Sequence, residues 1–291
     1  MKYVFIINPI SGGKDSTSIL QRRIGQAFSG NDTHSYEILL TQYAGHAREI
    51  AAQAVIDEID VVVAAGGDGT MNEVCSALVH SETAFGLIPM GSGNGFARSL
   101  GIPLSIEAAI QRLLNPKIIS IDVGKINDCY FFGVAGVGLD AQIAAQFQEF
   151  GKRGPLPYFY VGFREFFKYS YEEITIMFDD RELITHPLLI TVANTHQYGN
   201  GAVIAPHADY RDGLLDLCII EKFNLFEGMF KFPSLFNNKI DRLSSYSTYR
   251  TAELHISRSE DSGIFHTDGE PHKGGRDLHI QLLKLALKVC S

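Results

Sequence analysis

The first 120 residues alternate short, wholly apolar runs with segments in which apolar residues recur every three or four positions. The apolar runs predict buried strands, and the second spacing predicts amphipathic helices. Strands are expected at 3–8, 35–41, 59–65 and 84–90, and helices at 16–28, 47–56, 71–79 and from Phe96 and Ile106. This alternation with fully apolar strands predicts a doubly wound, mostly parallel α/β sheet covered by helices on both faces.

The pattern changes after residue 117, where short strand-like runs dominate and Asn-Asp, Asp-Asp and Asp-Gly turn signals separate them. Strands are expected at 118–126, 129–135, 173–178, 187–192, 214–220, 252–256 and 278–289, with helices at 155–169 and around 226–236. At 291 residues, two domains are the sensible expectation. We expect an α/β domain at 1–122 and a mostly antiparallel β domain at 123–291.

Three glycine-rich turns follow predicted strands of the first half. They are Asn8-Pro9-Ile10-Ser11-Gly12-Gly13-Lys14, Gly66-Gly67-Asp68-Gly69-Thr70 and Gly91-Ser92-Gly93-Asn94-Gly95. Glycine at the mouth of a strand lets backbone N–H groups approach a phosphate, and a helix that begins just beyond favours negative charge. Ligands of parallel sheets bind at the carboxyl ends of the strands, where all three turns fall. The turns therefore predict a nucleotide site and a phosphoryl-transfer enzyme.

The turn at 66–70 has the strongest signal. A plain strand-to-helix connection needs one glycine and an Asp N-cap, whereas three glycines surround Asp68. Mg²⁺ prefers a carboxylate with waters and phosphate oxygens, so Asp68 is a candidate ligand, and Thr70 adds a hydroxyl. The turn at 8–14 lacks P-loop spacing and has generic turn residues. Ser92 is either part of a helix N-cap region or a nucleotide contact, and His46 is expected to form local hydrogen bonds.

A second acidic glycine turn, His266-Thr267-Asp268-Gly269-Glu270, lies near the C-terminus. Asp-Gly is a strong hairpin signal, so the turn by itself favours a hairpin. The nucleotide-binding half contains no evident base. Glu270 therefore becomes the candidate that accepts the proton of a substrate hydroxyl.

Composition narrows the partners and the compartment. The formal net charge of −8 argues against nucleic acid as the main partner, because phosphate-backbone binding relies on clustered Lys and Arg. No apolar run approaches the ~20 residues of a membrane span, and the run at 1–8 is too short for a signal peptide. The four cysteines show no C-x-x-C spacing and are expected to be reduced, mostly buried thiols. A soluble, cytoplasmic protein is predicted.

Two aromatic-rich segments, 158–169 and 223–236, lie in the second half. In the first, Phe159, Phe163, Phe166 and Phe167 recur at helical spacing, with Arg164 and Lys168 among them. One interpretation is a helix that packs on the β domain. The other is an apolar face that receives acyl chains, with the basic residues near lipid head groups. Both hold if one helix face packs and the other binds.

Taken together in this order, the turns, Thr41-x-x-Ala44-Gly45-His46-Ala47 and Asp268-Gly269-Glu270 resemble the diacylglycerol kinase family. The resemblance is closer to the soluble bacterial lipid kinases related to diacylglycerol and sphingosine kinases, and it covers essentially the whole chain. It implies an NAD kinase/diacylglycerol kinase-like α/β domain, a β-sandwich domain, and ATP in the cleft between them. It further implies Mg²⁺-dependent phosphorylation of a lipid hydroxyl presented at the inner membrane face. Homodimerisation stays open.

The resemblance also assigns roles to residues. The expected ATP contacts are Asn8, Pro9, Ser11, Gly12, Gly13, Lys14, Thr41, Gly66, Gly67, Asp68, Gly69, Thr70, Glu73, Ser92 and Asn94. Glu270 matches the catalytic base, and Asp68 is also expected to organise the catalytic Mg²⁺. Asp140 matches a lipid head-group contact. Asp209, Asp212 and Leu214 match a segment in which some bacterial members hold a structural Mg²⁺.

One departure from the family pattern leaves the lipid open. Gly95 stands where many diacylglycerol kinases carry an Asp, and Gly-Ser-Gly-Asn is closer to the sphingosine and ceramide kinases. An NAD kinase-like enzyme also uses Gly-Gly-Asp-Gly but does not account for the turns at 8–14 and 91–95. A catalytically silent nucleotide or lipid sensor is the alternative from a different class of protein.

Overall fold

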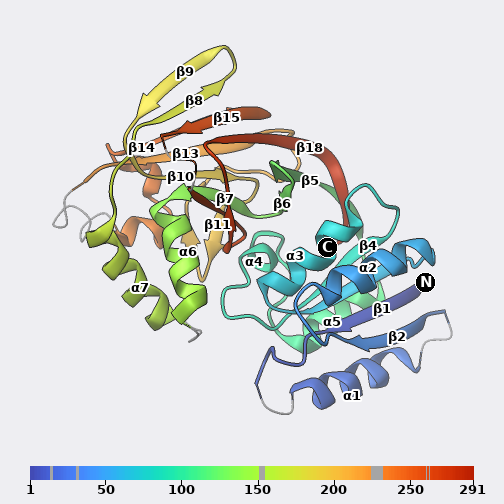
Figure 1. The fold of residues 1–291 in the computed structure, drawn as a ribbon. Coiled ribbons are helices and arrows are strands. Elements are labelled where there is room, and N and C mark those ends of the chain that lie inside the picture. The colour runs from blue at the N-terminus through green and yellow to red at the C-terminus, as the bar shows by residue number, and fades with distance from the viewer. Residues whose placement is uncertain (14–15, 31–32, 151–154, 224–231, 260, 262) are drawn as a thin grey trace. The chain divides into compact units, whose positions relative to one another are not determined.

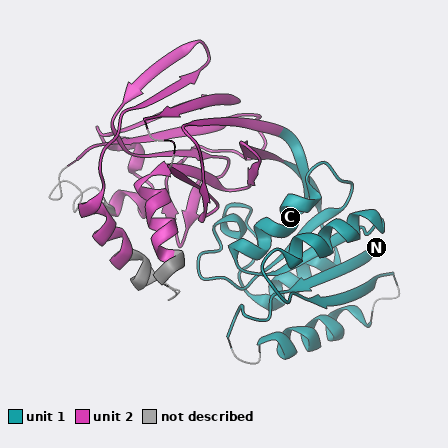
Figure 2. Ribbon diagram, in the orientation of Figure 1, with its two compact units in different colours: residues 1–121, 284–291 teal, residues 122–283 magenta. Residues whose placement is uncertain are grey.

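The computed structural model describes residues 1–13, 16–30, 33–150, 155–223, 232–259, 261 and 263–291 (Figure 1). Its contacts divide the chain into two compact units. The first contains residues 1–121 and 284–291, and the second contains residues 122–283 (Figure 2). The last eight residues thus belong to the first unit. A single boundary at residue 122 would place them in the second. The division into domains 1–122 and 123–291 stays a prediction.

The first unit is built on a parallel sheet with the strand order β2-β1-β3-β4. Its strands are β1 (Lys2–Ile7), β2 (Ser35–Leu40), β3 (Val61–Gly66) and β4 (Ala84–Pro89). Its helices are α1 (Ser16–Phe28), α2 (His46–Ile56), α3 (Asp68–Leu78), α4 (Gly95–Ser99) and α5 (Ile106–Leu114). The C-terminal end of the last strand, β18 (Asp277–Cys290), pairs in parallel with β4 through Val289 and Phe85.

Helices cover both faces of this sheet. Tyr3, Phe5 and Ile7 form one core cluster with residues of α1 and α5. Alternate residues of a strand face opposite sides, so the buried Val4 and Ile6 face the other side. There α2 contacts α3, and both contact β3. Both central strands, β3 and β4, are buried along their whole length. The doubly wound parallel architecture is confirmed.

The second unit contains two antiparallel sheets. One has the order β14-β13-β10-β7-β16-β17. The other is the antiparallel part of the sheet that continues through β18 into the first unit, in which β18 pairs with β15, β15 with β8, and β8 with β9. A separate short pair is formed by β11 and β12. The strands are β5 (Ile118–Ile126), β6 (Cys129–Phe131), β7 (Val134–Gly138), β8 (Ile174–Phe178), β9 (Arg181–Thr185), β10 (Pro187–Ala193), β11 (Gln197–Gly199), β12 (Ala202–Val203), β13 (Leu215–Glu221), β14 (Tyr246–Thr251), β15 (Glu253–Arg258), β16 (Ile264–Thr267) and β17 (Glu270–Lys273).

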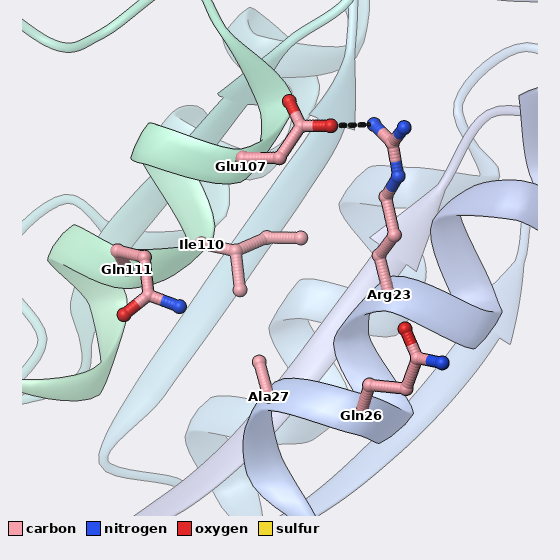
Figure 3. A pocket seen from close by; sticks show the side chains of 6 residues that line it. All are labelled: Arg23, Gln26, Ala27, Glu107, Ile110 and Gln111. Carbon is pink, nitrogen blue, oxygen red and sulfur yellow. Dashed lines mark ion pairs between the residues drawn. The ribbon is translucent and has the colours of Figure 1, made fainter.

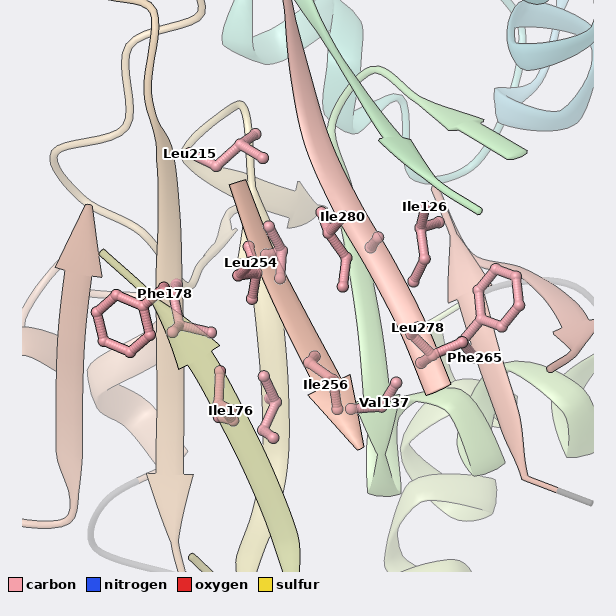
Figure 4. Packing of buried hydrophobic residues seen from close by; sticks show 14 of the residues in the cluster. Ile126, Val137, Ile176, Phe178, Leu215, Leu254, Ile256, Phe265, Leu278 and Ile280 are labelled. Atoms are coloured by element: carbon pink, nitrogen blue, oxygen red, sulfur yellow. The ribbon is translucent and has the colours of Figure 1, made fainter. Parts of the chain in front are cut away.

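The core of the second unit lies between these two sheets. Ile176, Leu254 and Ile256 of one sheet and Val137 and Leu215 of the other belong to a single buried cluster (Figure 4). Apolar side chains from two facing sheets define a β-sandwich. The sandwich predicted for the second half is therefore confirmed.

Two helices, α6 (Leu139–Phe150) and α7 (Pro155–Lys168), belong to the second unit and contact each other. A further buried cluster combines Leu139 and Tyr169 with Leu188, Cys218 and Ile220 of the six-stranded sheet. It lies on the face of that sheet opposite the sandwich core. Within the described part of the chain, no helix is both long and apolar enough to cross a membrane.

The sequence predictions for the second half were wrong in several places. The single strand expected at 129–135 is two strands, β6 and β7, because the chain turns at Phe132 and Gly133. Helix α6 and strands β9, β11, β12 and β14 were not predicted, and the two short strands around residue 269 were expected only through the Asp-Gly hairpin signal. Of the helix expected around 226–236, residues 226–231 lie outside the described residues, and Phe232–Leu235 forms a short 3₁₀ turn.

Replacing Gly124 of β5 with alanine should destabilise the second unit. A Cβ at this buried glycine would lie 2.0–2.4 Å from ring carbons of Phe131, which is fully buried. Overpacking of this kind costs about 1–3 kcal/mol of unfolding free energy, which urea denaturation measures. Gly30→Ala is the control, since no atom of the described residues lies within 4 Å of its added Cβ. Equal stability of the two variants would contradict the packing described for Phe131.

Candidate functional site

The turn at 66–70 connects β3 directly to α3. Gly67 is the N-cap residue with extended backbone angles (φ −90°, ψ −172°), and Asp68 is the first helical residue. Asp68 is therefore not the N-cap that a plain connection would use, and the glycine cap has no side chain that could satisfy the helix. The first N–H groups of a helix have no intrahelical acceptor and carry partial positive charge. The start of α3 is thus suited to bind an anion.

The turns at 66–70 and 91–95 approach each other at backbone distance. A Cβ added to Gly91 would lie 2.9 Å from the Cα of Gly67, and one added to Gly93 would lie 3.1 Å from Oδ2 of Asp68. Gly66 pairs with Pro89 in the sheet, so the two turns leave neighbouring strands at the same edge. Glycine is needed here because side chains would separate the two turns.

The turn that begins at Asn8 joins the same edge of the sheet. The Asn8 side chain donates from Nδ2 to Oγ1 of the buried Thr70 at 3.0 Å, and the Asn8 N–H donates to the Ala65 carbonyl at 3.0 Å. Ser11 is also buried, and its carbonyl accepts a hydrogen bond from the Ser16 hydroxyl. The structure thus brings three of the predicted turns together. Lys14 lies outside the described residues.

Thr41 and Glu73 lie near the same edge of the sheet and contact the end of β1 and the start of α2, respectively. The Thr41 N–H donates to the carbonyl of Ile7, the last residue of β1. The Glu73 carboxylate accepts the N–H groups of Gly45 (2.9 Å) and Ala47 (3.1 Å), so it holds the N-terminus of α2. Both carboxylate oxygens of Glu73 therefore already have backbone partners. A direct contact of Glu73 with ATP stays a prediction.

His46 forms the local hydrogen bond expected of it. Its Nδ1 accepts the N–H of Gln42 at 3.1 Å, and its ring stacks on Tyr43 with centroids 4.6 Å apart. These contacts stabilise the loop before α2, so the role of His46 in the structure is a local one.

The turn at 91–95 is pinned by its own asparagine. The Asn94 side chain accepts the Gly91 N–H at 3.0 Å and donates to the Gly91 carbonyl at 2.8 Å. Asn94 has a positive φ of 47° at the N-cap of α4, and the buried Gly95 follows as the first helical residue. Ser92 at the tip is exposed, as are Pro9, Gly12, Gly13 and Gly69. These exposed residues of the three turns are the most accessible to solvent and hence to a ligand.

In the second unit, the acidic glycine turn is a two-residue hairpin between β16 and β17. Thr267 pairs with Glu270, and Asp268 and Gly269 have positive φ of 51° and 85°, as a type I′ turn requires. The Asp268 carboxylate accepts three backbone N–H groups, from Phe132 (2.9 Å), Gly133 (2.7 Å) and Val134 (3.1 Å). The hairpin interpretation is confirmed. Glu270 is exposed beside this anchored turn.

A buried polar network that was not predicted lies directly behind the turn. Oδ2 of Asp140 lies 3.3 Å from Nε2 of His266 and accepts hydrogen bonds from the hydroxyls of Thr191 (3.2 Å) and Tyr198 (3.3 Å). Asp140 is 6% exposed and His266 is 2% exposed, so water scarcely reaches either group. The Gly269 N–H donates to Nδ1 of His266 at 3.3 Å, which connects the network to the turn.

Asp140, the predicted head-group contact, is therefore at the centre of this network. Its other oxygen accepts the N–H of Ala141 in the first turn of α6. A Cβ at Gly136 would lie 2.2 Å from Oδ2 of Asp140, so glycine on β7 makes the room for the carboxylate. The sequence signals were Asp140 itself, matched to the family, and the histidine that precedes the Asp-Gly-Glu motif, and neither showed that the two residues meet. The role of Asp140 toward a lipid stays a prediction.

His272 supports the same hairpin from β17. Its Nε2 lies 2.7 Å from the Thr267 hydroxyl, and its Nδ1 lies 3.8 Å from Sγ of Cys129. Burial lowers the pKa of His272, and the electrostatic interaction with the neighbouring His266 adds to this lowering. A neutral imidazole is thereby favoured at this position.

The segment predicted to hold a structural Mg²⁺ is rich in carboxylates. Asp209 and Asp212 each accept a backbone N–H two residues on, and Asp212 also forms an ion pair with Arg250. The Asp122 carboxylate accepts the N–H of Gly213 at 2.8 Å. These are oxygen donors of the kind that Mg²⁺ prefers.

One observation favours a cation near this segment. Oδ2 of the buried Asp216 has no hydrogen-bond partner among the described residues. Burial raises the pKa of Asp216 to about 6, the Arg250 charge lowers it by less, and Asp212 raises it. A buried carboxylate oxygen without a partner fits a hard cation, so the residues present are compatible with Mg²⁺. Occupancy by Asp209, Asp212 and the Leu214 carbonyl stays a prediction.

A separate surface pocket lies between α1 and α5 (Figure 3). It is lined by Arg23, Gln26, Ala27, Glu107, Ile110 and Gln111, and an ion pair joins Arg23 to Glu107. None of the predicted site residues that the structure describes lines this pocket.

The two units together define a class of protein in which a doubly wound α/β unit with glycine turns precedes an antiparallel β-sandwich. Residues 2–126 match the family model of the diacylglycerol kinase catalytic domain, and residues 133–290 match that of the YegS C-terminal NAD kinase beta sandwich-like domain. The chain belongs to the diacylglycerol kinase family.

Relatives and solved structures agree with this family. The chain is 33% identical over 229 residues to the diacylglycerol kinase of Bacillus subtilis, covering 76% of this chain and 74% of the relative. It is 31% identical over 231 residues to that of Staphylococcus aureus, covering 76% and 71%. A crystal structure of a diacylglycerol kinase from Bacillus anthracis has a similar fold, with a TM-score of 0.74, 20% identity and coverage of 99% of this chain and 96% of that one.

Asp268→Asn should loosen the anchored turn. Asparagine keeps one acceptor oxygen and tolerates positive φ, but its amide nitrogen cannot accept a backbone N–H. We expect a loss of about 1–3 kcal/mol of unfolding free energy in urea denaturation, because a buried donor loses a charged partner. Asp180→Asn is the matched control, since Asp180 is an exposed turn residue with φ of 59°. Equal stability of both variants would exclude an anchoring role for Asp268.

Proposed function

We propose that this protein is an ATP- and Mg²⁺-dependent lipid kinase, which transfers the γ-phosphoryl group of ATP to a hydroxyl of a diacylglycerol-like or sphingoid-like lipid. The observation that carries the proposal is the glycine-capped start of α3 among interlocked glycine turns, in a chain of a kinase family. Such a start offers backbone N–H groups and partial positive charge to phosphate oxygens.

Each turn has a part in holding the nucleotide. The exposed backbone at Gly12, Gly13 and Gly69 would approach the phosphates, with Ser92 at the tip of its turn. The bonds from Asn8 to Thr70 and within the Asn94 turn would keep this cradle fixed before ATP arrives. Asp68 would hold Mg²⁺, which neutralises phosphate charge when bound. Positioning and charge stabilisation account for most of the rate enhancement in phosphoryl transfer.

Glu270 would act on the acceptor. As the lipid oxygen bonds to the γ-phosphorus and ADP leaves, the hydroxyl proton passes to the Glu270 carboxylate. Its exposure makes it accessible to a substrate, and its neighbour Gly269 is held by Nδ1 of the buried His266. Asp140, through His266, would therefore position Glu270, and a base held in one orientation is the more effective one.

Asp68→Asn and Glu270→Gln should each lower kcat while the fold is kept. We expect a loss of about 10²–10⁴-fold for Glu270→Gln, the range of general-base contributions, with ATP binding retained. The measurement is transfer of labelled γ-phosphate from Mg·ATP to diacylglycerol, sphingoid bases, ceramide, phosphatidylglycerol and NAD. Glu182→Gln, an exposed carboxylate on β9, is the control.

The panel also separates the alternatives. A labelled lipid that Glu270→Gln no longer makes would support the lipid kinase and identify its acceptor. Labelled NADP would assign the protein to the NAD kinases. ATP binding without any product would favour a silent sensor, and wild-type turnover in both variants would refute the roles given to Asp68 and Glu270.

The lipid substrate calls for contact with a membrane, and α7 offers a surface for it. Tyr160, Phe163 and Phe167 are 59%, 62% and 59% exposed, although aromatic side chains are usually buried. Their spacing of three and four residues places them on one face of the helix, and the exposed Lys168 ends it. The opposite face packs through the buried Val161 and Glu165. We propose that this aromatic face binds the inner surface of the membrane, with the protein otherwise cytoplasmic.

Phe163→Glu and Phe167→Glu should weaken binding to vesicles of phosphatidylglycerol. A charge in the acyl region opposes insertion, so we expect at least about a tenfold loss of partitioning in a vesicle sedimentation assay. Turnover on a short-chain, water-soluble lipid should be retained. Ile184→Glu is the control, because Ile184 is also exposed, at 58%, but lies on β9. Unchanged partitioning of both Phe variants would exclude α7 from the membrane contact.

A further inference from the structure

Two histidines and a glutamate gather on one face of the second unit, outside the residues considered so far. Glu253 and His255 lie on β15, and His279 lies on β18, which runs antiparallel beside it (Figure 1). Residues two apart on a strand share a face, so Glu253 and His255 point to the same side. His279 is directly opposite His255 in the register, and Glu253 is its diagonal neighbour.

The two histidines approach closely because of the hydrogen-bond pattern around them. The His279 N–H donates to Oδ1 of Asn127 at 2.9 Å, and the His279 carbonyl accepts the Asn127 N–H at 2.8 Å. Both backbone groups of His279 therefore point away from β15. His255 and His279 form a non-hydrogen-bonded pair, in which side chains lie closer than in the alternative pair. Their rings stack with centroids 4.5 Å apart and an interplanar angle of 10°.

The Glu253 carboxylate completes the cluster. Its Oε1 lies 2.7 Å from Nε2 of His279 and 3.9 Å from Nε2 of His255. One donor atom from each residue lies within 4.8 Å of the other two. No other group of three or more Asp, Glu, His and Cys side chains comes this close in the part of the chain that the structure describes.

We propose that Glu253, His255 and His279 form a binding site for a divalent transition metal of the Zn²⁺ type. Two imidazole nitrogens and a carboxylate are a ligand set for Zn²⁺, with bonds of about 2.0–2.2 Å and a fourth position open to water. Tetrahedral bonds of that length place ligand atoms about 3.4 Å apart. The observed 2.7 and 3.9 Å bracket this separation, so each contact changes by less than about 1 Å on binding.

Exposure and chemistry both favour this metal class. All three side chains are partly exposed, by 62%, 51% and 39%, so an ion can enter without unfolding the sheet. Mg²⁺ prefers an all-oxygen shell, and imidazole nitrogens select softer ions. A bound ion would link β15 to β18, two interior strands of their sheet, and stabilise the face of that sheet that lies away from the sandwich core. The site is independent of the proposed kinase function.

The test uses the untagged, full-length protein freed of metal with a chelator and kept in excess Mg²⁺. Calorimetric titration with Zn²⁺ should give one site, and titration with Co²⁺ should give the visible absorbance of a tetrahedral nitrogen–oxygen site. Zn²⁺ should also raise Tm in proportion to the logarithm of its concentration. His255→Gln, His279→Gln and Glu253→Gln should each weaken Zn²⁺ binding by at least about tenfold and remove the rise in Tm.

The matched controls are His186→Gln and His207→Gln. These exposed histidines each form an ion pair with one carboxylate, Glu173 at 3.9 Å or Asp241 at 3.7 Å, and neither belongs to the cluster, so both variants should bind Zn²⁺ like the wild type. Absence of one-to-one binding by the wild type would overturn the proposal. So would equal binding by the three site variants, or binding that Cys129→Ser removes and His255→Gln does not, because Cys129 lies near His272.

Discussion

Close approach of backbone to backbone at the carboxyl edge of the parallel sheet is the constraint on which the candidate nucleotide site depends. The turns after β3 and β4 can lie against each other only because Gly91 has no side chain, since a Cβ there would lie 2.9 Å from the Cα of Gly67. Because the N-cap residue Gly67 has no side chain, the first turn of α3 has no side-chain cap and is open to an anion. Thr41 and the Asn8 turn lie at the same edge. Backbone hydrogen bonds join Thr41 to the end of β1 and Asn8 to the end of β3.

In the second unit, hydrogen bonds on both sides of a hairpin fix the position of the exposed Glu270. The hairpin that carries Glu270 is anchored on one side by Asp268, whose carboxylate neutralises three backbone N–H dipoles. On the other side, Gly269 is bound by His266, which in turn contacts the buried Asp140. Buried polar groups are costly unless they are paired, so such a network is rigid when its members are satisfied. Such rigidity would favour the general-base role proposed for Glu270.

Local patterns were a good guide where neighbours in sequence determine the structure. The helix 16–28 and the strand 118–126 begin and end at the expected residues, and the other strands of the first unit deviate by at most two residues. The Asp-Gly hairpin was likewise visible in the sequence. The predictions failed where distant residues decide. The chain turns at Phe132 and Gly133 because the carboxylate of Asp268, more than 130 residues later, binds their N–H groups.

The sequence by itself determined the class of fold, the glycine turns and the family, because apolar periodicity and turn chemistry are written in consecutive residues. Only the tertiary structure decided which polar residues do structural work. Glu73 holds the start of α2, and Asn94 pins its own turn. Asp140 and His266 meet across 126 residues of sequence. The Glu253, His255 and His279 cluster likewise depends on the register of β15 against β18. Strand register depends on which face of each strand is buried and on the connecting turns, so the pairing of His255 with His279 is decided only in the folded unit.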